Sequence, residues 1–86
     1  MKLVLIEWMD AYSDNSGWRS MKKLRKLKPI AVRSVGWLAS DEPDYVTLVS
    51  SLVADGSGDG DIVIPRGMIV GEITELHAWP NEGPVS

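Results

Sequence analysis

Hydrophobic and polar residues alternate along most of the chain, and this period of two is typical of β-strands with one buried face. Val4, Ile6 and Trp8 illustrate the pattern, because they share one face of the first predicted strand. The same character returns several times further along the chain. It predicts five short strands, over residues 2–9, 30–38, 45–53, 62–64 and 68–76.

The period changes between residues 18 and 28, where apolar residues recur every third position. They are Trp18, Met21, Leu24 and Leu27. With Lys and Arg between them, this spacing predicts a short amphipathic helix with a basic outer face. Ser16 or Ser20 is the expected N-cap, and Pro29 is expected to end the helix.

Turn-forming residues separate these elements. They predict a loop at 10–17, a turn at 40–44, an acidic Gly-rich loop at 55–61 and a tail at 77–86. Gly36, inside a predicted strand, indicates a bulge or a close approach of another backbone. Pro65 interrupts the chain between the last two strands.

The order of strands and helix predicts a mainly β domain with one short helix, spanning residues 1–76. Five short strands favour an antiparallel sheet closed into a small barrel, because closure removes exposed strand edges. The alternative is an α+β arrangement in which the helix lies across one face of the sheet.

Two resemblances follow from particular segments. The stretch Asp61–Ile69 resembles the end of an SH3-like barrel, where a strand runs into a proline-marked helical turn and then a closing strand. The chain lacks the aromatic and acidic loop signature of the SH3 domains that bind proline-rich peptides. A second set resembles small uncharacterised proteins of bacteriophages and prophages. It comprises Trp8, Gly17-Trp18, Ser34–Leu38, Asp44–Leu48 and Ile64-Pro65. This resemblance implies a phage accessory protein in the cytoplasm of a bacterial host.

Composition narrows the chemistry. The 86 residues include no Cys, which excludes disulfides, thiolate metal sites and Cys nucleophiles. Phe is also absent, while Trp occurs four times. Trp8 and Trp37 are expected to supply core bulk, and Trp79 in the tail is a candidate docking residue. The longest apolar run is four residues, so no membrane association is expected and the protein is expected to be cytoplasmic.

Charge is unevenly distributed. Residues 1–33 hold eight Lys and Arg against three acids, a net +5, and residues 34–86 hold one Arg against nine acids, a net −8. Six of the basic residues lie within the predicted helix. With the tryptophan that opens it, they form the candidate binding set: Trp18, Arg19, Lys22, Lys23, Arg25, Lys26 and Lys28.

This basic stripe leaves several interpretations open. It can bind an acidic protein surface, contact phosphates of a nucleic acid, mediate self-assembly into a homo-oligomer, or serve solubility alone. The favoured interpretation is a small non-enzymatic binding module with a protein partner. Nucleic acid is the weaker alternative, because the sequence pI is about 4.9 and nucleic-acid-binding domains are usually basic.

Catalytic and metal motifs are sparse. His77 is the single histidine, at the start of the predicted tail, and no acid–base or nucleophile arrangement surrounds it in sequence. We therefore expect no enzyme activity, no cofactor and no metal. The loop 55–61 matches the start of a calcium-binding pattern, but Arg66 stands where a bidentate Glu is needed. Whether this loop binds calcium stays open.

Overall fold

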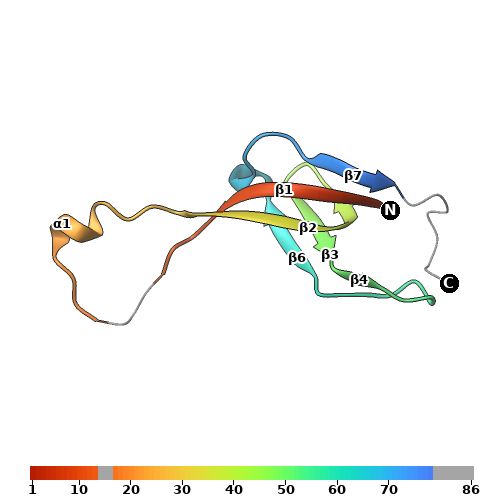
Figure 1. Ribbon diagram of the computed structural model, residues 1–86, viewed down its shortest axis with the longest axis horizontal. Coiled ribbons are helices and arrows are strands. Elements are labelled where there is room, and N and C mark those ends of the chain that lie inside the picture. The colour runs from red at the N-terminus through yellow and green to blue at the C-terminus, as the bar shows by residue number, and fades with distance from the viewer. Residues whose placement is uncertain (14–16, 79–86) are drawn as a thin grey trace.

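The computed structural model describes residues 1–13 and 17–78 of the chain. Its elements are β1 (Lys2–Asp10), α1 (Met21–Leu24), β2 (Ile30–Asp41), β3 (Tyr45–Val49), β4 (Ser51–Leu52), β5 (Gly58–Asp59), β6 (Ile62–Pro65), η1 (Arg66–Met68) and β7 (Thr74–Ala78). The element η1 is a single turn of 3-10 helix. Figure 1 shows the strands gathered into one body, with α1 at the far end of the connection from β1 to β2.

Five of these strands form one antiparallel sheet in the order β6-β3-β2-β1-β7, and β4 pairs separately with β5. The prediction of a mainly β fold of about five strands with one short helix is confirmed. The helix α1 has no buried residue and lies away from the sheet, so the alternative with a helix across one sheet face is wrong.

The long strand β2 belongs to both halves of the sheet. Its residues 30–37 pair with β1, and its residues 37–41 pair with β3. Gly36 lies at this changeover, where an added Cβ would stand 2.9 Å from the carbonyl oxygen of Val49. The predicted close approach of another backbone is therefore confirmed, and only glycine leaves room for β3 at this point.

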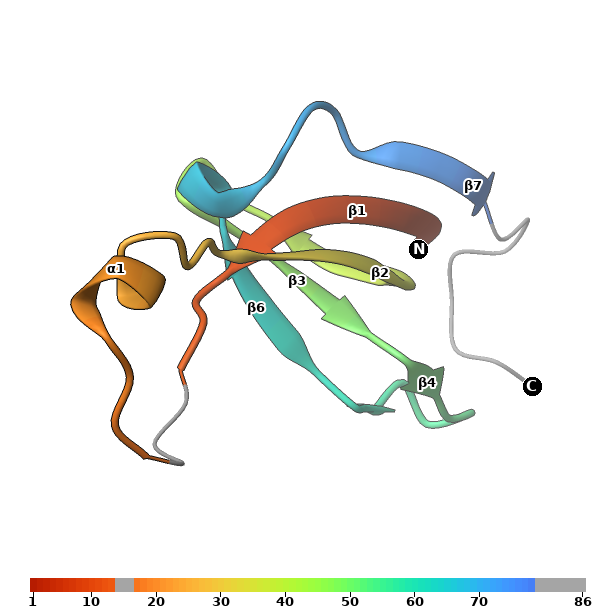
Figure 2. The ribbon, with the colours of Figure 1, turned by 60° about the vertical axis from the view of Figure 1, so that its left-hand side comes forward.

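The core lies inside the coiled sheet. It consists of Val4, Ile6, Trp8, Val46, Leu48 and Ile64, which come from β1, β3 and β6. Strands β1 and β6 are separated by two strands in the sheet order, so these side chains meet only because the sheet coils around them. Figure 2 shows this as β3 and β6 running across the direction of β1.

The two tryptophans expected in the core differ in burial. Trp8 is buried, and its indole Nε1 donates a hydrogen bond to Ser34 Oγ at 2.9 Å. This bond satisfies the one polar atom that the ring brings into the core. Trp37 is only half-buried and lies outside the core cluster, in which Trp8 is the one aromatic residue among the described residues.

The sheet is not closed into a barrel, and this part of the prediction is wrong. The edge strands β6 and β7 do not pair with each other. One reason is that β6 has four residues and ends at Pro65, which has no N–H to donate. Another is that β7 pairs only with residues 2–5 of β1. The chain crosses the gap through η1, after which the Val70 N–H donates to the Glu7 carbonyl at 2.8 Å.

The interruption predicted after Pro65 is present as η1, and Arg66 holds it in place. The Arg66 backbone N–H donates to the Asp44 carbonyl at 2.9 Å. Its Nε donates to the Glu42 carbonyl at 2.9 Å, and its guanidinium forms an ion pair with Asp41. These bonds tie η1 to the turn between β2 and β3.

Several element boundaries differ from the prediction. The strand expected over 45–53 breaks at Ser50, whose N–H donates to the Asp59 carbonyl at 3.1 Å. The acidic loop is therefore partly ordered as the β4–β5 pair. The last strand begins only at Thr74, after an isolated bridge between Ile69 and Trp8 and a bend at Gly71, and it ends at Ala78. The first two residues of the predicted tail thus belong to a strand.

Candidate functional site

The connection between β1 and β2, residues 11–29, is here called the arm, and the rest of the chain is called the body. Every described residue of the arm is exposed. Figures 1 and 2 both show the arm leaving the body at the ends of β1 and β2. The Cα radius of gyration is 16.6 Å, against about 12 Å for a compact chain of this length, which reflects this projection.

The helix in the arm is much shorter than predicted. Instead of 18–28, α1 covers only Met21–Leu24. Ser20 is its N-cap, and the Ser20 Oγ accepts a hydrogen bond from the Lys23 N–H at 3.3 Å. After Leu24 the backbone hydrogen bonds join residues three positions apart, as in a 3-10 helix, and the Leu27 N–H donates to the Leu24 carbonyl at 3.1 Å.

The cause of this shortening is the lack of a surface behind the helix. Helices of fewer than about 12 residues are marginal in water unless an apolar face packs against other elements. The arm supplies such a face in sequence, yet none of it is buried. The prediction that Pro29 ends the helix is therefore wrong, because α1 already ends at Leu24.

The arm instead presents its large apolar side chains to solvent. The exposed fractions are 104% for Trp18, 59% for Met21, 38% for Leu24, 44% for Leu27 and 40% for Tyr12. The sequence predicts that most of these residues alternate with charged residues on a helix whose apolar face is packed. The structure places them together on one projecting segment, where no body residue covers them.

The predicted basic residues lie on the same segment. Arg19 donates from Nη1 to the Tyr12 hydroxyl at 3.3 Å, and this bond links the start of the arm to the residues just before α1. The remaining cations are Lys22, Lys23, Arg25, Lys26 and Lys28. None of these five forms an ion pair within residues 1–13 and 17–78. The structure therefore places the whole candidate binding set on the arm. Trp79, the separate candidate docking residue, lies outside the described residues.

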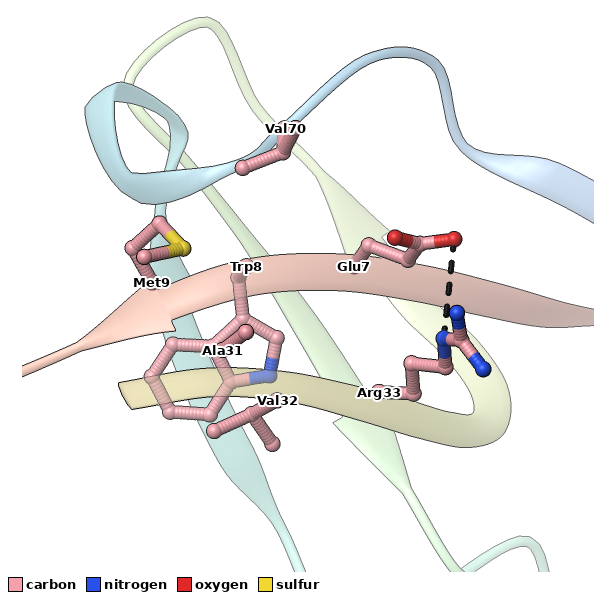
Figure 3. Close-up of a pocket in the computed structure, with 7 residues that line it drawn as sticks. All are labelled: Glu7, Trp8, Met9, Ala31, Val32, Arg33 and Val70. Atoms are coloured by element: carbon pink, nitrogen blue, oxygen red, sulfur yellow. Dashed lines mark ion pairs between the residues drawn. The ribbon is translucent and has the colours of Figure 1, made fainter. Parts of the chain in front are cut away.

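A cleft of about 490 Å³, which was not predicted from the sequence, lies where the arm joins the body. It is lined by Glu7, Trp8, Met9, Ala31, Val32, Arg33 and Val70. Figure 3 shows that these residues come from β1, β2 and the segment after η1. Glu7 and Arg33 are cross-strand partners and form an ion pair at 3.7 Å. The cleft depends on the pairing of β1 with β2, which joins residues as far apart in the sequence as Glu7 and Arg33. A single sequence does not reveal such pairing.

The acidic loop forms a turn with local hydrogen bonds. The Asp55 carboxylate accepts from the Ser57 hydroxyl and from the Ser57 N–H at 2.8 Å. These bonds lower the pKa of Asp55 below its ordinary value. Arg66, at the place where a calcium loop needs Glu, is engaged with Asp41 instead. In the part of the chain that the structure describes, no three His, Cys, Asp or Glu side chains gather as metal ligands.

His77 lies in β7, opposite Leu3 in the register, and not in a tail. The described residues include no helix that is both long and apolar enough to span a bilayer. Comparisons of the chain with protein-family models, with curated proteins and with solved structures find no match. The candidate site therefore rests on its geometry and charge.

Proposed function

We propose that the protein is a small non-enzymatic binding module, a phage or prophage accessory protein whose arm binds an acidic surface on a host or viral protein. The observation that carries the proposal is the combination on one projecting segment of six cations and five exposed apolar side chains. Exposed apolar residues rimmed by charge are typical of protein-binding surfaces. Trp and Arg are the residues most enriched where binding energy concentrates.

Each part of the arm has a separate role in this proposal. The cations give the arm a net charge of +5 and steer it toward an acidic partner. Trp18 is the expected anchor, because a fully exposed indole has its whole apolar surface left to bury. The cleft at the base of the arm offers a second point of contact.

Nucleic acid is the alternative partner, and the aliphatic side chains weigh against it. Phosphates would neutralise the cations, yet they would leave Met21, Leu24 and Leu27 exposed to water. The chain as a whole is also acidic, with a net charge of −3. An apolar groove with an acidic rim on a protein satisfies both kinds of side chain.

The test compares capture by matched baits in a nuclease-treated bacterial lysate, with the phage proteins present. The baits are the unaltered chain, Trp18→Ala, Lys22→Glu with Lys23→Glu, and the control Lys2→Glu, which reverses an exposed charge on the body. We expect one acidic protein on the unaltered and control baits that is lost from both arm variants. Purified, it should bind with one-to-one stoichiometry in calorimetry.

Two outcomes would overturn the proposal. One is equal capture of every protein by all four baits. The other is a mobility shift with nucleic acid whose affinity falls steeply with salt and depends on the arm, with no protein retained.

A further inference from the structure

We infer that the arm also docks on a second copy of this chain, forming an antiparallel dimer in which each arm lies on the acidic end of its partner. The acidic end is defined as residues 53–63, which include the β4–β5 turn and the start of β6. The inference rests on the proposed function to the extent that both treat the arm as a protein-binding surface. It adds a particular partner and a means of regulating the same site.

Charge complementarity is the first argument. The arm carries a net +5, while the rest of the chain holds three cations against eleven acids, a net −8. No Lys or Arg occurs between Arg33 and Arg66, so the acidic end has no cation of its own. Asp55, Asp59 and Asp61 form no ion pair within the described chain. Both surfaces therefore have charge left unpaired, and the signs are opposite.

Apolar complementarity is the second argument. The acidic end exposes 50% of Val53 and 55% of Val63, beside its carboxylates. The arm exposes Trp18, Met21 and Leu24 beside its cations. A contact between the two surfaces thus covers apolar side chains on both sides while pairing the charges around them.

The shape of the molecule makes this contact intermolecular. The Cα atoms extend over 54 × 25 × 20 Å, and Figure 1 shows α1 and β4 toward opposite ends of the long axis. One chain cannot bring its arm to its own acidic end without unfolding β1 and β2. Two chains side by side and antiparallel bring both pairs of surfaces together at once. Such an arrangement is closed by a two-fold axis, the commonest symmetry of homo-oligomers.

The dimer would also regulate the proposed binding site. The dimer contact and the proposed contact with an acidic partner both use Trp18 and the cations of the arm. A second copy that binds the arm therefore covers the proposed binding site. Dissociation at low concentration would then expose the arm to its acidic partner. The two contacts compete, and a foreign partner should shift the chain from dimer to a one-to-one complex.

Sedimentation equilibrium on the purified full-length chain is the first measurement. We expect the mass to rise from the 9.5 kDa monomer toward twice that value, and no further. Because exposed ion pairs are weak, we expect a Kd of about 100 μM at about 50 mM salt. At about 500 mM salt the Kd should weaken at least about tenfold, since salt screens the charges. Trp18→Ala should weaken it by a similar factor.

A charge-swap experiment then identifies the two surfaces. Variant one is Lys22→Glu with Lys23→Glu, and variant two is Asp59→Lys with Asp61→Lys. Each variant alone should stay monomeric, because like charges would face each other at both contacts. Mixed in equal amounts, they should form a one-to-one dimer with nearly the affinity of the unaltered chain, because the mixture restores opposite charges at both contacts. Glu72→Lys, on the body outside the acidic end, should dimerise as the unaltered chain does.

Three results would overturn the inference. They are a monomer under all conditions, a mixture of folded variants that fails to pair, and masses that grow beyond the dimer. Thermal melts of each variant establish that it is folded, so loss of association is not loss of structure. None of these results touches the proposed function, whose capture test uses dilute bait and a different protein.

Discussion

The body and the arm differ in what holds each of them in place. In the body, the side chains at alternate positions meet inside a coiled sheet, and five of them, including Ile6 and Ile64, are less than 3% exposed. In the arm, apolar side chains of similar size recur at helical spacing but none is buried, and the helix covers only four residues. Hydrophobic patterning therefore orders a segment only where another surface of the molecule receives it.

Substitution of Ile6 tests this difference with the largest expected effect. Ile6→Ala leaves a cavity in the core and should lower the free energy of unfolding by about 2–5 kcal/mol. Leu24→Ala, the matched change in the arm, should alter it by less than about 0.5 kcal/mol. Urea denaturation of both variants measures the contrast. If Ile6→Ala does not fold, Ile6→Val should still cost about 0.5–1.5 kcal/mol. Equal losses at the two sites would mean that the arm packs on the body in solution.

Gly36→Ala probes the changeover within β2. The new methyl group would stand 2.9 Å from the Val49 carbonyl and 3.2 Å from the Leu48 Cβ, so backbone has to move. We expect a loss of about 1–3 kcal/mol in the free energy of unfolding. Gly67→Ala is the control, because an added Cβ there meets no atom within 4 Å and its φ is not positive. A Gly36→Ala protein as stable as the control would show that β2 and β3 are more loosely paired than described.

Removing the arm tests whether the body depends on it. Asp10 and Ile30 are paired residues of β1 and β2, so a two-residue Asn-Gly turn can replace residues 11–29. Because a shorter loop costs less entropy to close, the free energy of unfolding should rise by roughly 1–2 kcal/mol. Calorimetry should show one cooperative transition, and sedimentation should show a monomer. A broad or missing transition would contradict the division into body and arm.

The smallest expected effect concerns Asp55 at the acidic end. Hydrogen bonds from Ser57 lower its pKa, so they favour the folded state above the ordinary Asp pKa of about 3.9 and stop doing so as pH falls through the lower folded value. Ser57→Ala should raise the Asp55 pKa toward its ordinary value, as measured by NMR titration of the carboxyl carbon. Ser51→Ala, on the neighbouring strand, should leave that pKa unchanged. An unchanged pKa in Ser57→Ala would mean that the backbone N–H alone sets it.

The sequence was sufficient for features that depend on neighbours along the chain. Alternation located β1, β2 and β3, Gly36 marked the close approach of β3, and Pro65 marked the start of η1. The six cations of the arm and Trp18 were also named from the sequence as candidates for binding. Each of these features has a local cause, either a side-chain period or a backbone restriction.

The features that were missed depend on distant segments. The extent of α1 depends on whether a surface covers its apolar face, and none does. Closure depends on whether β6 reaches β7, which the length of β6 and the crossing through η1 prevent. The cleft at the base of the arm combines Glu7, Arg33 and Val70, which pairing alone brings together. The periodic pattern of a short stretch of sequence does not show which distant segments come into contact.

The pairing of Asp10 with Ile30 has a consequence for how such a protein can evolve. The arm leaves and re-enters the body on adjacent residues, so its sequence and length can change while the sheet stays intact. Selection on the sequence of the arm and selection on the ability to fold then act on separate stretches of the chain. The arm can therefore vary rapidly among such proteins while one scaffold is kept.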